Sequence, residues 1–168
     1  GRQADNFNRV IQRAIPSTGE LIPAVGMGTA STFDTNDNPQ TLAQLAEIMR
    51  LFFAGGGTVI DSSPMYGHAE SRLGEVMAML PDVPDIFAAT KVWTQGRENG
   101  IAQMQQSAAR MGVARFDLMA VHNLKDWRTH LDTLKQSLRS VAETTAEWDM
   151  LDAHGRQEWV VAARLSYA

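Results

Sequence analysis

The alternation of short apolar runs with segments of helical periodicity is the feature that most constrains how this 168-residue chain can fold. The apolar runs have the length and composition of buried strands, and they lie at 24–28, 58–61, 86–91 and 117–122. The segments between them carry apolar residues three and four positions apart and lie at 40–54, 68–79 and 98–111. This order predicts an α/β fold of the (β/α) TIM-barrel type, with a parallel sheet and helices outside it.

The two ends of the chain are predicted to differ from this core. Residues 9–26 hold two short runs around a Ser-Thr-Gly turn, which indicates an N-terminal hairpin. From 128 to 153, apolar residues again fall three and four apart, which predicts one helix or two. Residues 158–163 could be a fifth strand or a continuation of the helical segment.

Length and composition bound the class of protein. With 44% hydrophobic and 20% charged residues, we expect a single globular domain, 1–168. A net charge of −4 offers no basic surplus for nucleic acid or an anionic membrane, and no apolar run approaches the roughly 18 residues of a membrane helix. The absence of cysteine excludes disulfides and thiolate metal sites. The chain starts at Gly1 rather than Met, so its compartment stays open between the cytoplasm and, if an export signal was removed, the periplasm.

Ionisable side chains stand at the ends of successive predicted strands. Asp61, Lys91 and His122 are the last residues of the runs that precede them, and Tyr66 lies in the loop after the first of these runs. The carboxyl ends of parallel strands meet at one end of a barrel, where barrel enzymes place their chemistry. We therefore expect these four side chains to lie close together.

The four residue types together suit the donation of a proton to a carbonyl oxygen. A tyrosine hydroxyl is a weak acid with a reference pKa of about 10, and a nearby ammonium group stabilises the phenolate. Lys91 could supply that charge, and Asp61 beside it would keep the lysine protonated. His122 could donate a hydrogen bond to the substrate oxygen or share in a proton relay. Tyr66 would then be the general acid, and the four do not form an obvious metal site.

Each of these residues alone also has an ordinary structural explanation. Asp61 could cap the following loop, Tyr66 could pack in it, Lys91 could be a surface charge, and His122 could be a hydrogen-bonded core histidine. The Gly55-Gly-Gly57 triplet more readily ends a helix than cradles a phosphate, and no G-x-G-x-x-G motif follows a strand. The interpretation depends on the four side chains sharing one end of the sheet.

Several stretches resemble the aldo-keto reductase family. They are 57–74, which includes Asp-Ser-Ser-Pro-Met-Tyr at 61–66, together with 22–29, 89–93 and 118–123. The resemblance covers about 9–127 and implies a (β/α)8 barrel that reduces a small carbonyl substrate with NADPH, the hairpin lying over the barrel floor. It implies catalytic roles for Asp61, Tyr66, Lys91 and His122. It further implies cofactor contacts from Gly28, Thr29 and Asp61, and substrate contacts from Trp93 and His122, although Trp93 could equally be apolar packing.

The length of the chain departs from the family pattern. A TIM barrel typically takes about 250 residues, so 9–127 corresponds to the N-terminal half of a barrel and 128–168 is a divergent segment. Half a barrel exposes strand edges, and a homodimer, another assembly, the helical segment or the rest of a longer protein could cover them. Two hypotheses follow: an NADPH-dependent carbonyl reductase, or a catalytically inactive, truncated or recombined half-barrel that self-associates.

Overall fold

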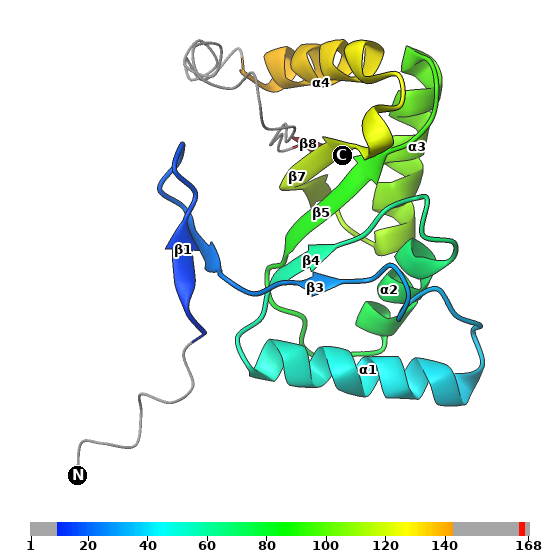
Figure 1. The fold of residues 1–168 in the computed structure, drawn as a ribbon. Helices are drawn as coiled ribbons and strands as arrows, with labels where there is room; N and C mark the ends of the chain where they lie inside the picture. The colour runs from blue at the N-terminus through cyan, green and yellow to red at the C-terminus, as the bar shows by residue number, and fades with distance from the viewer. Residues whose placement is uncertain (1–9, 143–164, 167–168) are drawn as a thin grey trace.

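The computed structural model describes residues 10–142 and 165–166 (Figure 1). In chain order, the strands are β1 (Gln12–Ala14), β2 (Leu21–Pro23), β3 (Met27–Gly28), β4 (Val59–Asp61), β5 (Phe87–Val92), β6 (Arg115–Phe116), β7 (Leu118–Val121) and β8 (Leu165–Ser166). The helices are α1 (Pro39–Ala54), α2 (Ala69–Ala78), α3 (Arg97–Met111) and α4 (Trp127–Ala142), with a 3-10 turn η1 (His122–Leu124) after β7.

A four-stranded parallel sheet, in the order β3-β4-β5-β7, forms the centre of the described fold. Helices α1 to α4 follow one another around it, and each contacts the next (Figure 1). The predicted parallel sheet with outer helices is therefore confirmed. The described strands form part of a TIM-barrel-type α/β fold, with β3 and β7 at the edges of this sheet.

Helix α1 shows why the sequence begins and ends its helices where it does. The Asn38 side chain accepts a hydrogen bond from the backbone N–H of Thr41 at 2.8 Å, and Pro39 follows as the first helical residue. Leu45 and Met49, four positions apart, are buried in the hydrophobic core. The glycine triplet then ends the helix, as predicted, with Gly56 at a φ of +84°.

Helices α2 and α3 approach so closely that one backbone touches the other. A methyl group at Gly74 would overlap the carbonyl oxygen of Arg110. Beside this contact, the buried Glu70 carboxylate accepts hydrogen bonds from Thr90 at 2.8 Å and Ser107 at 3.0 Å. Glu70 therefore ties α2 to α3 and to β5, next to the strand end that carries Lys91.

The N-terminal hairpin is confirmed, and β1 pairs with β2 in antiparallel register. It lies on the side of the sheet from which β3 starts (Figure 1). The strand expected at 117–122 is confirmed as β7, which begins one residue later and ends one residue earlier, because Asp117 separates it from β6 and His122 belongs to η1. Helix α4 accounts for the predicted helical segment up to Ala142, whereas the rest of 128–153 and all of 158–163 lie outside the described residues.

Candidate active site

The predicted residues meet at the carboxyl ends of the parallel strands. Asp61 ends β4, Lys91 is the penultimate residue of β5, and His122 directly follows β7. The sheet register aligns these ends, because Gly28 pairs with Asp61 and Asp61 with Ala89, two residues before Lys91. The strand pattern that suggested the site therefore also brings its side chains to one edge.

Lys91 and Asp61 form the central contact of the site. The Lys91 ammonium donates to both carboxylate oxygens of Asp61 at 2.7 Å, and to the carbonyl of Ser62 at 2.7 Å. The Lys91 side chain is 16% exposed and that of Asp61 is 44% exposed. The lysine is thus held by three acceptors in a partly desolvated position, which fixes its charge at a defined point.

Tyr66 lies between this ion pair and His122. The Lys91 Nζ atom is 5.1 Å from the centroid of the Tyr66 ring, and the His122 ring meets the tyrosine edge-on at 5.6 Å between centroids. Among the residues that the structure describes, none forms a hydrogen bond with the Tyr66 hydroxyl. The phenol is half-buried and leaves its hydroxyl available to a ligand.

His122 is also held by a serine. Its Nδ1 atom lies 2.7 Å from Ser63 Oγ, and Ser63 has no exposed surface. Burial and the neighbouring charge of Lys91 lower the pKa of His122 below its ordinary value of 6.5, against the opposing effect of Asp61. The imidazole is therefore neutral at pH 7, and a neutral imidazole has one donor and one acceptor nitrogen.

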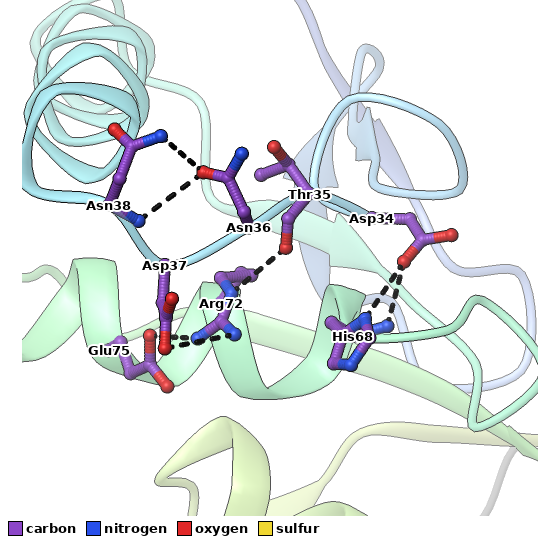
Figure 2. A network of polar contacts seen from close by, with 8 residues as sticks. All are labelled: Asp34, Thr35, Asn36, Asp37, Asn38, His68, Arg72 and Glu75. Atoms are coloured by element: carbon purple, nitrogen blue, oxygen red, sulfur yellow. Dashed lines mark hydrogen bonds and ion pairs between the residues drawn. The ribbon is translucent and has the colours of Figure 1, made fainter.

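A polar contact fixes the loop that carries Tyr66 (Figure 2). The Asp34 side chain, in the loop after β3, accepts a hydrogen bond from the His68 backbone N–H at 2.9 Å. This hydrogen bond is the main reason why the pKa of Asp34 is lowered. Gly67, the residue before His68, has a φ of +54°, and a Cβ at Gly67 would overlap the Asp34 carboxylate.

Arg72 makes a second link between the same two segments. Its Nε donates to the carbonyl of Thr35 at 3.1 Å, and its guanidinium pairs with the carboxylates of Asp37 and Glu75 (Figure 2). Arg72 belongs to α2, whereas Thr35 and Asp37 precede α1. The loop after β3 is therefore tied at two points, His68 and Arg72, to the part of the chain that follows Tyr66.

Gly28 and Thr29, predicted to contact a cofactor, are placed differently. Gly28 is exposed, and a Cβ added there would meet no atom within 4 Å, so the end of β3 leaves room for a ligand. Thr29 is fully buried, and its hydroxyl donates to the carbonyl of Asp61 at 3.0 Å and lies 2.9 Å from Ser62 Oγ. This side chain therefore joins β3 to β4, and the cofactor contact expected of Thr29 stays a prediction.

Trp93, predicted to line a substrate pocket, is half-buried just beyond β5. Its backbone N–H donates to the side chain of Gln103 at 2.6 Å, and the Lys125 ammonium lies 4.6 Å from the indole centroid. Sequence reasoning missed both neighbours. A glutamine within a helix, such as Gln103, has no sequence signal that would predict a contact with a distant residue. The position of Lys125 depends on the backbone of the preceding loop, which the sequence did not predict.

That loop after β7 has an unusual backbone. Asn123, Leu124 and Asp126 all have φ values between 51° and 53°, a region that costs energy for residues other than glycine. The loop is held at both ends, because Asn123 donates to the sulfur of Met65 at 3.7 Å and Asp126 accepts from the Gly96 backbone N–H at 2.8 Å. The same hydrogen bond is the largest cause of the lowered pKa of Asp126.

Three further observations concern the residues that the structure describes. A cavity of about 480 Å³, lined by residues including Met77, Pro84 and Ile86, lies at the opposite end of the strands from the candidate site. Within residues 10–142 and 165–166, no group of three or more acidic or histidine side chains could hold a metal ion. None of the helices in that part of the chain is both long and apolar enough to span a membrane.

Comparisons with known proteins concern the fold and the family of the chain. The sequence profile of the Aldo/keto reductase family matches residues 24–155. No curated protein sequence matches the chain. Among solved structures, it is similar to the thermostable aldo-keto reductase Tm1743 in complex with epalrestat, at 23% identity and a TM-score of 0.66 over 79% of this chain and 51% of that one.

Two other solved structures show the same likeness. The silkworm (Bombyx mori) aldo-keto reductase AKR2E5, complexed with NADPH, has 24% identity and a TM-score of 0.54 over 77% of this chain and 46% of that one. An aldo/keto reductase from Klebsiella pneumoniae, in complex with NADP and acetate, has 20% identity and a TM-score of 0.59 over 73% and 44%. The chain spans between 44% and 61% of the length of such structures.

Proposed function

This chain belongs to the aldo/keto reductase family, and we propose that it takes part in NADPH-dependent reduction of a small carbonyl substrate. The observation that carries the proposal is the placement of the Lys91 ammonium, held by both oxygens of Asp61, 5.1 Å from the centre of the Tyr66 ring. A fixed positive charge beside a phenol is what a tyrosine needs to act as an acid near neutral pH.

Each residue has a separate role in this proposal. Tyr66 donates its hydroxyl proton to the oxygen of the carbonyl as that oxygen becomes an alkoxide. Lys91 stabilises the phenolate that remains, and Asp61 holds the lysine ammonium in place. His122 donates a hydrogen bond to the same substrate oxygen, and Trp93 bounds the space that the substrate occupies.

NADPH, when bound, supplies the hydride that reduces the carbonyl carbon. The open space at Gly28 suits the close approach of a flat ring to the end of β3, so the residues present fit the nicotinamide end of the cofactor. Asp61, 44% exposed, stands at the same strand end and could contact this part of the cofactor. The described residues thus provide groups for the reacting end of NADPH.

We further propose that a second copy of the chain, or another protein, covers the edges of the sheet. Strands β3 and β7 each pair on one side within the described residues, and exposed strand edges favour association. Ile11, Leu21 and Val25, in and beside the hairpin, are between 63% and 66% exposed, which adds an apolar surface. Closed two-fold assemblies are the commonest solution for such surfaces.

A second candidate function follows from the length of the match. Because the chain spans about half of the similar solved structures, it could be a self-associating half-barrel without catalytic activity. NADPH binding distinguishes the two candidates. We expect the reductase to bind NADPH at micromolar concentrations, measured by calorimetry or by the cofactor's fluorescence, and to form a dimer in size-exclusion chromatography with light scattering.

The tyrosine tests the chemistry separately from binding. Tyr66→Phe removes only the hydroxyl, so we expect turnover of a model aldehyde to fall by a factor of at least about 10² while NADPH affinity changes little. Met79→Leu, at an exposed methionine at the C-terminal end of α2, is the matched control and should keep turnover. Absence of NADPH binding at high micromolar cofactor would exclude the reductase for this chain, and full activity in Tyr66→Phe would exclude the proposed acid.

A further inference from the structure

The hydrogen bond between Ser63 and His122 determines which nitrogen of the imidazole carries the proton. Ser63 Oγ lies 2.7 Å from His122 Nδ1 and also accepts a hydrogen bond from the Met65 backbone N–H at 3.2 Å. The serine has no exposed surface, so water does not compete for its hydroxyl. Two arrangements of protons are compatible with the distance, and the surroundings distinguish between them.

In the first arrangement, the Ser63 hydroxyl donates to Nδ1 and its oxygen accepts from Met65. The serine hydroxyl hydrogen and the lone pair of His122 Nδ1 are then both used, and the serine oxygen accepts one hydrogen bond. In the second, His122 donates from Nδ1, and the serine proton is left in a buried position with no acceptor among the described residues. An unsatisfied buried donor costs free energy comparable to a lost hydrogen bond, so the first arrangement is the more stable.

We propose that Ser63 is a positioning residue that holds His122 as the tautomer with its proton on Nε2. The Met65 backbone N–H contributes to this arrangement, because it donates to the serine oxygen and so directs the serine hydroxyl toward the imidazole. Nε2 has no hydrogen-bond partner among the described residues, so it is the nitrogen that remains for a ligand. The serine thereby makes Nε2 a donor.

The consequence for ligand choice follows from the chemistry of the two tautomers. An Nε2–H group attracts a carbonyl oxygen or a developing alkoxide, whereas a bare Nε2 lone pair would repel it. This consequence for reduction rests on the proposed function. The tautomer itself does not, because it is a property of the chain without cofactor or substrate.

Nitrogen-15 NMR tests the tautomer directly. Long-range proton–nitrogen spectra of the labelled chain at about pH 7.5, above the ordinary titration range of histidine, distinguish a bare imidazole nitrogen from a protonated one. The His122 signals are assigned by their loss in His122→Gln. We expect Nδ1 to be the bare nitrogen and Nε2 the protonated one, and the opposite pattern in the unmodified chain would overturn the proposal without any serine variant.

Variants at the serine test the cause. Ser63→Ala removes a hydrogen bond and should lower the ratio of the Nε2–H to the Nδ1–H form about fivefold, the equivalent of one net hydrogen bond. Ser63→Thr keeps the hydroxyl and should restore the ratio. Ser62→Ala is the matched control, because Ser62 is also fully buried but bonds to Thr29, and it should leave the His122 signals unchanged.

The outcomes separate this proposal from the proposed function. A ratio unchanged in Ser63→Ala would show that the serine does not determine the tautomer. If the serine variants behave as expected but the chain fails to bind NADPH, the tautomer assignment stands and only the reductase function is rejected.

Discussion

Replacing Lys91 by methionine tests how much of the site depends on its ammonium group. Methionine keeps most of the side-chain volume but removes the charge and all three donated hydrogen bonds, two to Asp61 and one to the carbonyl of Ser62. Loss of the ammonium costs a different amount of free energy at Asp61 and at the Ser62 carbonyl, because the two groups differ in their access to water. The total change in the free energy of unfolding can therefore be estimated by adding these contributions.

The Asp61 side chain is 44% exposed, so water replaces the ammonium there, and the loss is close to that of a surface ion pair, about 0.5–1 kcal/mol. Ser62 is fully buried, and loss of the donor to its carbonyl costs about 1–3 kcal/mol. Removal of an ammonium on a side chain only 16% exposed returns part of this sum. We expect a net destabilisation of about 1–2 kcal/mol and a fall in Tm of about 3–8 °C.

A double-mutant cycle measures the pairwise part of this effect. Lys91→Met, Asp61→Asn and the double variant are unfolded with urea and followed by circular dichroism, and we expect a coupling energy of about 1 kcal/mol. The matched control is the exposed pair Glu47 and Arg50 on α1, at 2.7 Å, for which the coupling should be about 0.3–0.5 kcal/mol. Additivity at Lys91 and Asp61 within about 0.3 kcal/mol would refute the reasoning.

Two further predictions concern packing and pH. Gly74→Ala should lower the free energy of unfolding by about 1–3 kcal/mol, because the added methyl would overlap the carbonyl of Arg110. Gly28→Ala is the control, because its methyl would meet open space and should not destabilise the fold. Equal losses of stability for the two variants on urea unfolding would contradict this prediction. Burial and Lys91 lower the pKa of His122, so on acidification the unfolded chain takes up this proton first. The free energy of unfolding should therefore be fully retained above about pH 6.5 and fall below it, and His122→Gln should reduce that slope in melting curves between about pH 7.5 and 5.5. The same slope in wild type and variant would argue against a lowered pKa.

Local sequence signals were sufficient for the central sheet and for the edge at which the site lies. Apolar runs that end in Asp61 and Lys91 predict both a strand and the position of its ionisable residue, because parallel strands all present their carboxyl ends on one side. The register Gly28 to Asp61 then completes the arrangement.

Contacts between distant residues could not be predicted in the same way. The bond from Ser63 to His122 joins residues 59 positions apart, and a serine in a turn reads as an ordinary loop former. The local sequence around Thr29 is the same whether its hydroxyl faces a ligand or the neighbouring strand. Only the register of β3 against β4 determines that this hydroxyl bonds to the carbonyl of Asp61. The pairing of β6 with β8 involves two residues on each side, too few to show a period.

The order β3-β4-β5-β7 has a consequence for how such a chain can change over time. Each strand of this sheet pairs with the strand of the same sheet that precedes it in the sequence, so no strand has to be inserted between two others. A chain leaving the ribosome can thus add one strand and one helix at a time to a structure already formed. Insertions, divisions and fusions at the edges of β3 and β7 would leave Asp61 and Lys91, on the two inner strands, next to each other. The proton-handling pair is therefore the part of this fold best protected when the number of strands around it changes.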